Sequence, residues 1–357
     1  MGGEFMLGIE TSCDETSTAV VARGGEVRSL VISSQARLHS KYGGVVPEVA
    51  GRAHLEALLP ALREALSQAG IGYRDLKGVA VTRGPGLVGS LLVGLTAAKA
   101  LCFALELPLL AVNHLEAHIY ANFLHFPGLK PPLLCFVVSG GHTLLVHMTG
   151  HRRYRVLGET LDDAAGEAYD KIARFLGLGY PGGPEIDRLS EEGNPEAIPF
   201  PRALMHDGTY DFSLSGLKTA VINYVRKERA EGREISVKDV AASFQAAVVD
   251  VQVFKLVRAV EETGVKKVAL AGGVAANRYL RSRLREALGE KGAELYYPPL
   301  PLCADNAAMV AYLGWRMLEE GDVAPLDVDA AASLPLPGTS PGKGKRSRRD
   351  KAPGGGP

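Results

Sequence analysis

The sequence lacks a net charge, closely spaced cysteines and an uninterrupted apolar segment of membrane-spanning length. Its 40 basic and 40 acidic side chains cancel, so any RNA contact must come from a local patch or a partner. The four cysteines form no CxxC pair, which argues against a disulfide framework or cysteine-only zinc site and favours reduced thiols in a cytoplasmic protein. The most apolar stretch, 87–107, is interrupted by Ser90, Thr96, Lys99 and Glu106, so we expect a buried helix there and no membrane partner.

The composition is that of a globular protein with enough length for two lobes. The chain has 357 residues, of which 46% are hydrophobic and 22% charged. Residues 1–5 lack a signal-peptide pattern and resemble a cloning remnant. Beyond Pro335 the composition changes, and Gly, Pro and Ser alternate with Lys and Arg over 336–357. We expect a disordered basic tail there, and a solvated tail is favoured over an arm that touches RNA.

A strand, polar turn, strand, turn, strand, helix order occurs twice and predicts a duplicated α/β fold. The N-terminal lobe is expected over 6–131 and the C-terminal lobe over 132–330, with an insertion at about 179–262. Two facing lobes would form a cleft where the strand-end loops converge, which is where α/β sheets bind ligands. Two unrelated α/β halves fit the same pattern. A helix at 47–68 is expected to carry Leu55, Leu58, Leu59, Leu62 and Leu66 on one face.

Two histidines four residues apart follow an apolar strand. His114 and His118 would share one helix face, so that both imidazoles can reach one metal ion. In HExxH zinc proteases a glutamate directly follows the first histidine, but Leu115 occupies that position here. Glu116 is rotated by about 200° from His114 and should point away from the ion. Peptide hydrolysis is therefore disfavoured.

Asp305 is the candidate third metal ligand. It precedes an apolar helix, so a plain helix N-cap is its alternative role. Two histidines and one carboxylate with open coordination positions suit a catalytic iron(II) ion, with zinc as the alternative.

Glycine-rich turns stand where strands end. The Ser139–Thr143 turn is either a tight hairpin or a nest of N–H groups for phosphate, and Gly84–Gly86 and Gly272–Gly273 precede helices whose N-termini attract anions. Asp170 is either an exposed helix residue or a ligand of sugar hydroxyls. Asp14, in the matching turn of the first lobe, is either a turn residue or a base or electrostatic group at the reacting centre.

Taken together, these motifs resemble the TsaD family, the catalytic subunit of tRNA threonylcarbamoyladenosine synthesis, formerly labelled a glycoprotease. The resemblance covers about Met6 to Leu326. It is carried by seven segments, in order: Glu10–Thr16, Gly84–Gly86, Asn113–His118, Ser139–Thr143, Asp211–Lys218, Gly272–Asn277 and Asp305–Asn306.

The resemblance implies the duplicated fold of actin, Hsp70 and the sugar kinases. It also implies metal ligation by His114, His118 and Asp305, a role for Asp14 in activity, and nucleotide contacts from Val137 to Gly141 and from Asp170, Gly183, Asp187 and Asn277. Without the resemblance, Gly183 is typical of a loop and Asn277 is typical of a helix N-cap. Combined with the glycine turns, the candidate substrate and nucleotide residues are Val137, Val138, Ser139, Gly140, Gly141, His142, Thr143, Asp170, Gly183, Asp187, Gly272, Gly273 and Asn277.

The reaction implied is acyl transfer. N6 of the tRNA adenosine just 3′ of the anticodon would attack threonylcarbamoyl-AMP, and AMP would leave. The resemblance also implies an adenylate or ATP-type nucleotide in the glycine loops, a paralogous TsaB-like subunit and a TsaE-like ATPase. An ATP-dependent phosphotransferase or chaperone-like ATPase of the same fold, and a non-catalytic scaffold, are the alternatives that remain.

Overall fold

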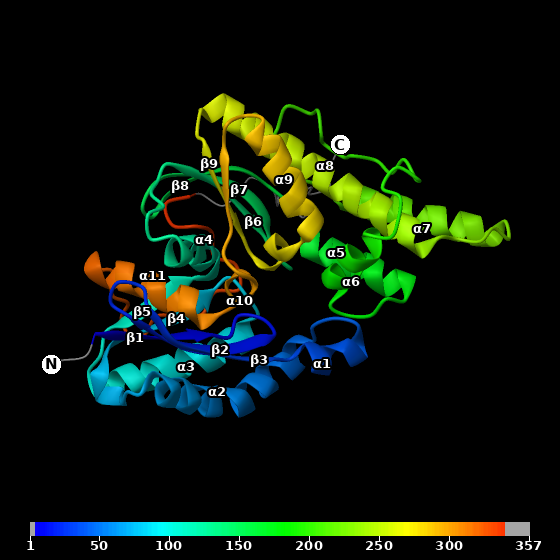
Figure 1. Ribbon diagram of the computed structural model, residues 1–357. Helices are drawn as coiled ribbons and strands as arrows, with labels where there is room; N and C mark the ends of the chain where they lie inside the picture. Colours follow the sequence, from blue (N-terminus) through cyan, green and yellow to red (C-terminus); the bar gives the residue numbers. More distant parts are fainter. Residues whose placement is uncertain (1–3, 340–357) are drawn as a thin grey trace, which may run out of the picture.

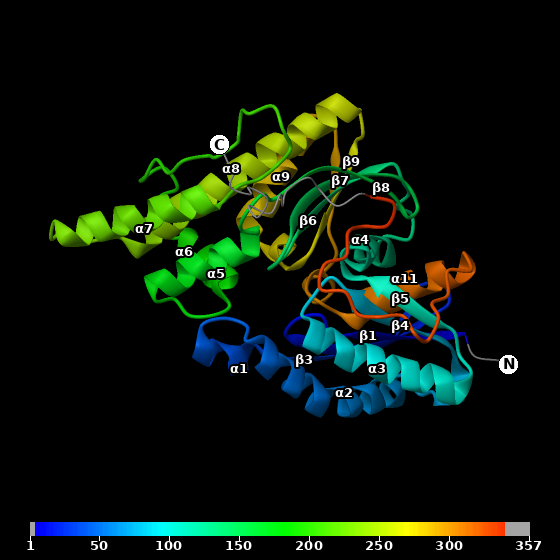
Figure 2. The ribbon, with the colours of Figure 1, turned by 180° about the vertical axis from the view of Figure 1, so that it is seen from behind.

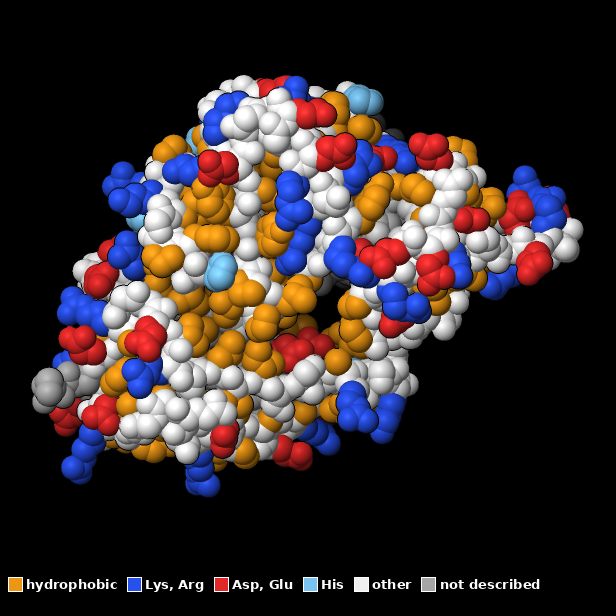
Figure 3. Space-filling view, viewed as in Figure 1, with side chains coloured by type: hydrophobic (Ala, Val, Ile, Leu, Met, Phe, Trp, Pro, Cys, Tyr) orange, Lys and Arg blue, Asp and Glu red, His pale blue; other side chains and the backbone are white. Residues whose placement is uncertain are grey.

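The computed structural model describes residues 4–339, which form two lobes around a hollow (Figures 1 and 3). The first sheet has the strand order β3-β2-β1-β4-β5, in which β1, β2 and β3 are antiparallel and β4 and β5 run parallel to β1. Its strands are β1 (Phe5–Glu10), β2 (Glu15–Ala22), β3 (Val27–Ser34), β4 (Leu76–Gly84) and β5 (Leu109–Asn113).

The second sheet repeats this arrangement. Its order is β10-β9-β6-β7-β8, so that β6, β7, β8, β9 and β10 correspond to β1 through β5 in position and direction. Its strands are β6 (Leu133–Val138), β7 (Thr143–Gly150), β8 (Arg153–Glu159), β9 (Lys267–Ala271) and β10 (Glu294–Tyr296). The shared order confirms the predicted duplication and the two-lobe fold.

One helix of each half packs on the sheet of the other half. Helix α4 (His114–His125) follows β5 and contacts β6 and β9, while α11 (Ala307–Glu319) follows the second sheet and contacts β1, β2 and β4. The two helices also contact each other in the middle of the molecule (Figure 1). Most of α4 is buried, including the two histidines at one end. This exchange places the start of α4 and the segment before α11 side by side.

Two long helices cover the outer face of the first sheet (Figure 2). Helix α2 (Pro47–Ala69) buries Leu58, Leu62 and Leu66, whereas Leu55 and Leu59 are 65% and 58% exposed. At 100° per residue all five leucines lie within about 100° of the helix circumference, so they share one face as predicted. Only part of that face is covered by the rest of the fold.

Helices α3 (Val88–Leu105) and α8 (Val237–Thr263) are long and apolar enough to cross a bilayer by length and composition. In α8, 83% of the most apolar window is buried inside the fold, whereas in α3 only 33% is. The expectation of a buried helix at 87–107 therefore holds for one face of α3. Leu91 and Leu95 pack inward, and Phe103 is 77% exposed.

The predicted insertion contains three helices, of which α8 forms the core of the second lobe. Gly182–Ser190 forms α6, and Ser215–Ala230 forms α7. Helix α5 (Ala165–Leu176) precedes them, and α9 (Arg278–Gly289) and the short α10 (Leu300–Cys303) follow. The proposed remnant at 1–5 is described only from residue 4, and Phe5 belongs to β1. Of the proposed tail, residues 336–339 are described, with Leu336 buried, and 340–357 lie outside the described residues.

Candidate metal and nucleotide site

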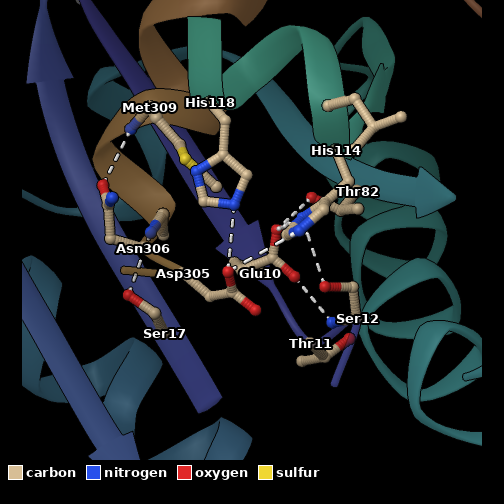
Figure 4. Close-up of polar contacts among 12 residues, drawn as sticks. Glu10, Thr11, Ser12, Ser17, Thr82, His114, His118, Asp305, Asn306 and Met309 are labelled. Atoms are coloured by element: carbon tan, nitrogen blue, oxygen red, sulfur yellow. Dashed lines mark hydrogen bonds and ion pairs between the residues drawn. The ribbon is translucent and has the colours of Figure 1, made fainter. Parts of the chain in front are cut away.

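The two histidines are placed by a capped helix start. The Asn113 side-chain oxygen accepts hydrogen bonds from the backbone N–H groups of Leu115 (2.9 Å) and Glu116 (3.1 Å), so α4 begins directly after β5. His114 and His118 then lie one turn apart on the same face (Figure 4). Both side chains are buried.

Asp305 completes the cluster from the other half of the chain. Asn306, not Asp305, is the N-cap of α11, because its side-chain oxygen accepts from Met309 N–H at 3.0 Å. The Asp305 carboxylate is therefore free to face the imidazoles, and its Oδ1 lies 3.1 Å from His118 Nε2 and 3.6 Å from His114 Nε2 (Figure 4). The three ligand atoms lie within 4.8 Å of one another, a spacing compatible with one metal ion.

A buried glutamate at the end of β1 orients His114. Glu10 Oε2 lies 3.0 Å from His114 Nδ1 and accepts from Thr82 Oγ1 at 2.6 Å, while its Oε1 accepts from Ser12 N–H at 2.6 Å. A proton on Nδ1 shared with Glu10 would leave Nε2 as the nitrogen that can bind a metal ion. Sequence reasoning omitted Glu10 from the site. The available signal was a carboxylate at the end of a fully apolar strand.

The charges of the cluster influence one another. Burial disfavours the cationic form of His114, but Asp305 and Glu10 outweigh it and raise the pKa of His114 to about 9. Burial and the neighbouring His114 lower the pKa of His118. Burial opposes ionisation of Asp305, yet the two histidines hold its pKa well below the usual range. The cluster thus concentrates negative charge beside imidazole nitrogens, which is the environment that a divalent cation needs.

We expect Glu10→Gln to weaken metal binding while the fold persists. The amide keeps the shape of the side chain but loses the charge that fixes the His114 ring, so affinity for zinc should fall roughly 10- to 100-fold. Competition with a chromophoric chelator measures this. Glu26→Gln, at an exposed position, is the control and should bind zinc like the wild type. Equal affinities for all three proteins would remove Glu10 from the site.

Glu116 points away from the cluster, as predicted. Its Oε1 accepts from Arg152 Nε at 3.1 Å and from the Tyr154 hydroxyl at 2.9 Å, on the opposite side of α4 from the histidines. A buried carboxylate held by these two donors is in no position to activate a water molecule on the ion. The geometry therefore counts against the peptidase alternative.

The turn between β6 and β7 is tied to the start of α5. Ser139 and Gly140 accept with their carbonyl oxygens from Gly166 N–H (3.2 Å) and Glu167 N–H (3.1 Å). Thr143 Oγ1 accepts from Ala165 N–H at 2.9 Å. The first amides of α5 therefore donate their hydrogen bonds to this turn, so the turn is held by the helix and is not an isolated hairpin. Burial and the two cluster histidines lower the pKa of His142, in the same turn, to about 4.

The glycines fall into two groups according to what surrounds them. A Cβ atom at Gly140, Gly141, Gly183 or Gly273 would meet nothing within 4 Å. Gly272 differs, because its φ is +90° and a Cβ there would lie 2.4 Å from the Val138 carbonyl oxygen. The first group leaves backbone open to a ligand, whereas Gly272 is required for close packing between β6 and the β9 turn.

The Gly84–Gly86 turn also serves packing. A Cβ at Gly84 would lie 2.1 Å from the Ala331 carbonyl oxygen, and one at Gly86 would lie 2.6 Å from the Ser12 carbonyl oxygen. Leu87 N–H, at the start of α3, donates to Ser12 at 2.8 Å. The glycines of this turn are thus required for close packing against Ser12 and Ala331, and the Leu87 amide before α3 is already engaged within the chain.

Three polar candidates make structural hydrogen bonds around the open glycines. Asp170 accepts from Gly182 N–H at 2.7 Å, at the start of α6. Asn277 caps α9 by accepting from Leu280 N–H at 2.7 Å, and its amide donates to Gln245 at 2.7 Å. Gln245 in turn donates to Asp187 at 3.3 Å. Gln245, from buried α8, is a linking residue that sequence reasoning missed.

Asp14 meets the second lobe across the hollow. Tyr180, in the loop before α6, donates from its hydroxyl to Asp14 Oδ2 at 3.1 Å. Asp14 lies in the turn between β1 and β2, so the contact joins the strand-end turn of one lobe to the insertion of the other. This pairing could not be predicted from local sequence, since 166 residues separate the two positions.

Glu15, beside Asp14, should make stability depend on pH. Its Oε2 is buried without a hydrogen-bond partner among the described residues, and burial raises its pKa from 4.5 to about 7. The folded state binds this proton more tightly than the unfolded state, so stability is lost as pH rises from about 4.5 to 7. Glu15→Gln should therefore stabilise the protein by about 1–2 kcal/mol at pH 8, allowing for partial exposure, and by much less at pH 5.

Urea unfolding at the two pH values measures this difference. Glu56→Gln, at an exposed position, is the control and should change the free energy of unfolding equally at pH 5 and pH 8. A Glu15→Gln protein that gains no stability between pH 5 and pH 8 relative to the wild type would contradict the assignment.

Comparison with known proteins identifies the family. The sequence pattern of TsaD, the tRNA N6-adenosine threonylcarbamoyltransferase, matches residues 26–312. The proteins of that description from Desulfitobacterium hafniense and Symbiobacterium thermophilum are each 56% identical to this chain, over 93% of it and 97% of their own length. The chain belongs to this family. Membership confirms the resemblance stated from the motifs and makes the chain a transferase, whose family name specifies a tRNA adenosine as acceptor.

Solved structures with the same fold belong to proteins with other names. HypF from T. kodakarensis has a TM-score of 0.59 at 16% identity, covering 88% of this chain and 48% of that one. Component A of the (R)-2-hydroxyglutaryl-CoA dehydratase of Acidaminococcus fermentans has a TM-score of 0.55 at 15% identity, covering 88% and 99%. At such identities the likeness shows the fold alone, and the family assignment rests on sequence.

Proposed function

We propose that this chain transfers the threonylcarbamoyl group from threonylcarbamoyl-AMP to N6 of the tRNA adenosine 3′ of the anticodon, releasing AMP. The observation that carries the proposal is the convergence of His114, His118 and Asp305 at the junction of the two lobes of a chain 56% identical to named threonylcarbamoyltransferases. An anticodon-loop base is already unpaired, so little duplex must open for it to enter a pocket.

The donor atoms fit a divalent metal ion. Two imidazole nitrogens and one carboxylate oxygen face each other, and Glu10 Oε2, 3.0 Å from His114 Nδ1, would hold the Nδ1 proton while Nε2 binds the ion. Three protein ligands with open positions suit iron(II), with zinc as the alternative. When bound, such an ion supplies a positive charge that polarises carboxylate, carbonyl or phosphate oxygens of a substrate.

The open glycines support an adenylate site. Gly140, Gly141, Gly183 and Gly273 have space where side chains would otherwise stand, and backbone amides there can approach a phosphate or a ribose closely. The Asp187–Gln245–Asn277 hydrogen bonds hold the α6, α8 and α9 walls of this space together. The Asp170 carboxylate, engaged with Gly182, holds the start of α6 in place.

The transfer forms a bond between N6 and the carbamoyl carbon and breaks the bond from that carbon to the phosphate oxygen of AMP. N6 loses one proton, and AMP leaves as the anion. An aromatic amine is a weak nucleophile, so positioning of the two substrates by the loops supplies much of the rate. Asp14 is the proposed proton acceptor or electrostatic group, and its hydrogen bond with Tyr180 fixes its direction.

A nucleotide-dependent phosphotransferase of the same fold is the main competing function, and two labelled donors separate it from acyl transfer. The chain and its partner proteins are incubated with unmodified tRNA and either threonylcarbamoyl-AMP labelled in the acyl group or ATP labelled in the γ-phosphate. Acyl label should enter tRNA with one AMP released per group. Transfer of the γ-phosphate to RNA or protein, without acyl transfer, would overturn the proposal.

An exposed apolar surface on the first lobe supports the proposed paralogous subunit. Leu55 and Leu59 of α2 and Val88, Leu92 and Phe103 of α3 are exposed on neighbouring helices. Patches of large apolar side chains on adjacent elements are typical of protein interfaces. We place the TsaB-like partner on this surface, away from the hollow. A TsaE-like ATPase remains part of the proposal on family grounds.

A further inference from the structure

A band of basic side chains runs over α9 to the rim of the hollow between the lobes (Figure 3). The helix carries Arg278, Arg281, Arg283 and Arg285 within eight residues. The chain as a whole has no net charge, so a polyanion can be attracted only by a local excess of this kind.

Two of these arginines are neutralised and two are not. Arg278 pairs with Asp187 (3.1 Å) and Glu191 (2.6 Å), and Arg283 pairs with Asp250 (3.4 Å). Arg281 and Arg285 have no carboxylate within 4.0 Å among the residues described, 4–339. The positive charge of the band therefore resides mainly on these two residues.

A tyrosine holds both uncompensated guanidinium groups without neutralising them. Arg281 Cζ lies 4.2 Å from the centroid of the Tyr297 ring, and Arg285 donates to the Tyr297 hydroxyl. Cation–π and neutral hydrogen-bond contacts leave the full charge available while restricting the rotamers. Two arginines fixed in this way lose less conformational entropy when they bind an anion.

Arg281 connects this pair to the glycine turn and to the segment that precedes Asp305. The Arg281 guanidinium donates to the Ala275 carbonyl oxygen, in the turn that contains Gly273, and lies 3.4 Å from Cys303 Sγ. Cys303 is two residues before Asp305 in the chain. The charged surface therefore begins beside the metal cluster and the glycine turn and extends outward along α9.

We propose that Arg281, Arg285 and Tyr297 form a docking surface for the phosphate backbone of the tRNA substrate. The inference rests on the proposed transfer to tRNA, and it names the side of the hollow on which the RNA lies. When the target base enters the site, the RNA backbone must pass over the rim of the hollow. There it would meet the two guanidinium groups, which are held in place by Tyr297. Guanidinium groups bind phosphate in a bidentate manner, and tyrosine at the same place offers a ring to an unpaired base.

The experiment uses the full chain with its partner proteins and unmodified tRNA. Arg285→Gln removes an exposed charge, and the Arg281→Gln/Arg285→Gln double variant removes both. Arg226→Gln is the matched control, because Arg226 is an exposed arginine of α7 with no carboxylate within 4.0 Å among the described residues. Binding of tRNA is measured across a salt series, and transfer is measured as KM for tRNA and kcat.

Each lost phosphate contact should weaken binding roughly five- to eightfold at about 0.1 M salt and lower the salt slope by about 0.7–0.9. KM for tRNA should rise by a similar factor, with a much smaller change in kcat. The control should match the wild type. Wild-type affinity and salt slope in the double variant, in a preparation that still acylates tRNA, would overturn the docking surface alone. Absence of product from the wild type would instead overturn the proposed function.

Discussion

His118→Ala is expected to abolish tight binding of the divalent metal ion and to lower transfer to tRNA by at least about 100-fold. His118 is buried and its Nε2 faces Asp305 at 3.1 Å, so its loss leaves two ligands where three converged. Loss of residues that only orient a ligand already costs roughly 10- to 100-fold, so loss of the ligand itself should cost at least as much. Metal content by elemental analysis and single-turnover transfer measure the two effects.

His125→Ala is the matched control for this variant. His125 ends the same helix but is exposed, and it makes no contact with the cluster. It should keep wild-type metal content and activity. A His118→Ala protein that is free of metal yet transfers at the wild-type rate would show that the cluster has no part in the reaction.

Gly273→Leu is expected to destroy adenylate binding without unfolding the protein. A Cβ at Gly273 meets nothing within 4 Å, so the larger side chain enters open space that the nucleotide is proposed to fill. Affinity for AMP should fall at least about tenfold, which corresponds to about 1.4 kcal/mol. The melting temperature should change little. Calorimetric titration and thermal unfolding measure the two quantities.

Gly272→Ala is the comparison at the next position, where the opposite result is expected. A φ of +90° and a Cβ placed 2.4 Å from the Val138 carbonyl oxygen make any side chain costly in the folded state. The strain of such a backbone alone is about 1–3 kcal/mol. Stability should therefore fall markedly at 272 and not at 273. Normal AMP affinity in Gly273→Leu would remove the glycine turn from the proposed site.

Local periodicity was enough to predict most of the strands, the duplication and the shared face of the two histidines. These features depend on residues close together in sequence, such as the Asn113–His118 helix start. Asp305 was also a candidate from the sequence, but the sequence left open whether it is a metal ligand or a helix N-cap. The structure excludes the cap, because Asn306 takes that position, and it places the Asp305 carboxylate beside the two histidines.

The features that sequence reasoning missed depend on contacts between distant segments. Glu10 reaches His114 across 104 positions, and Tyr180 reaches Asp14 across 166. The sequence predicted the leucine face of α2 but not the exposure of Leu55 and Leu59, because an apolar stripe does not indicate how much of it another element covers. Likewise, the Gly84–Gly86 turn and Gly273 look alike in sequence, and only the packing around each separates a structural glycine from an open one.

The most direct test of the central claim is the mass of the nucleosides in treated tRNA. The complete mixture receives unmodified tRNA and threonylcarbamoyl-AMP labelled with ¹³C in the threonylcarbamoyl group, and the tRNA is then digested and analysed by mass spectrometry. We predict labelled threonylcarbamoyladenosine from the adenosine 3′ of the anticodon, and none when His118→Ala replaces the wild type. Absence of the labelled nucleoside from the complete wild-type mixture would contradict the account.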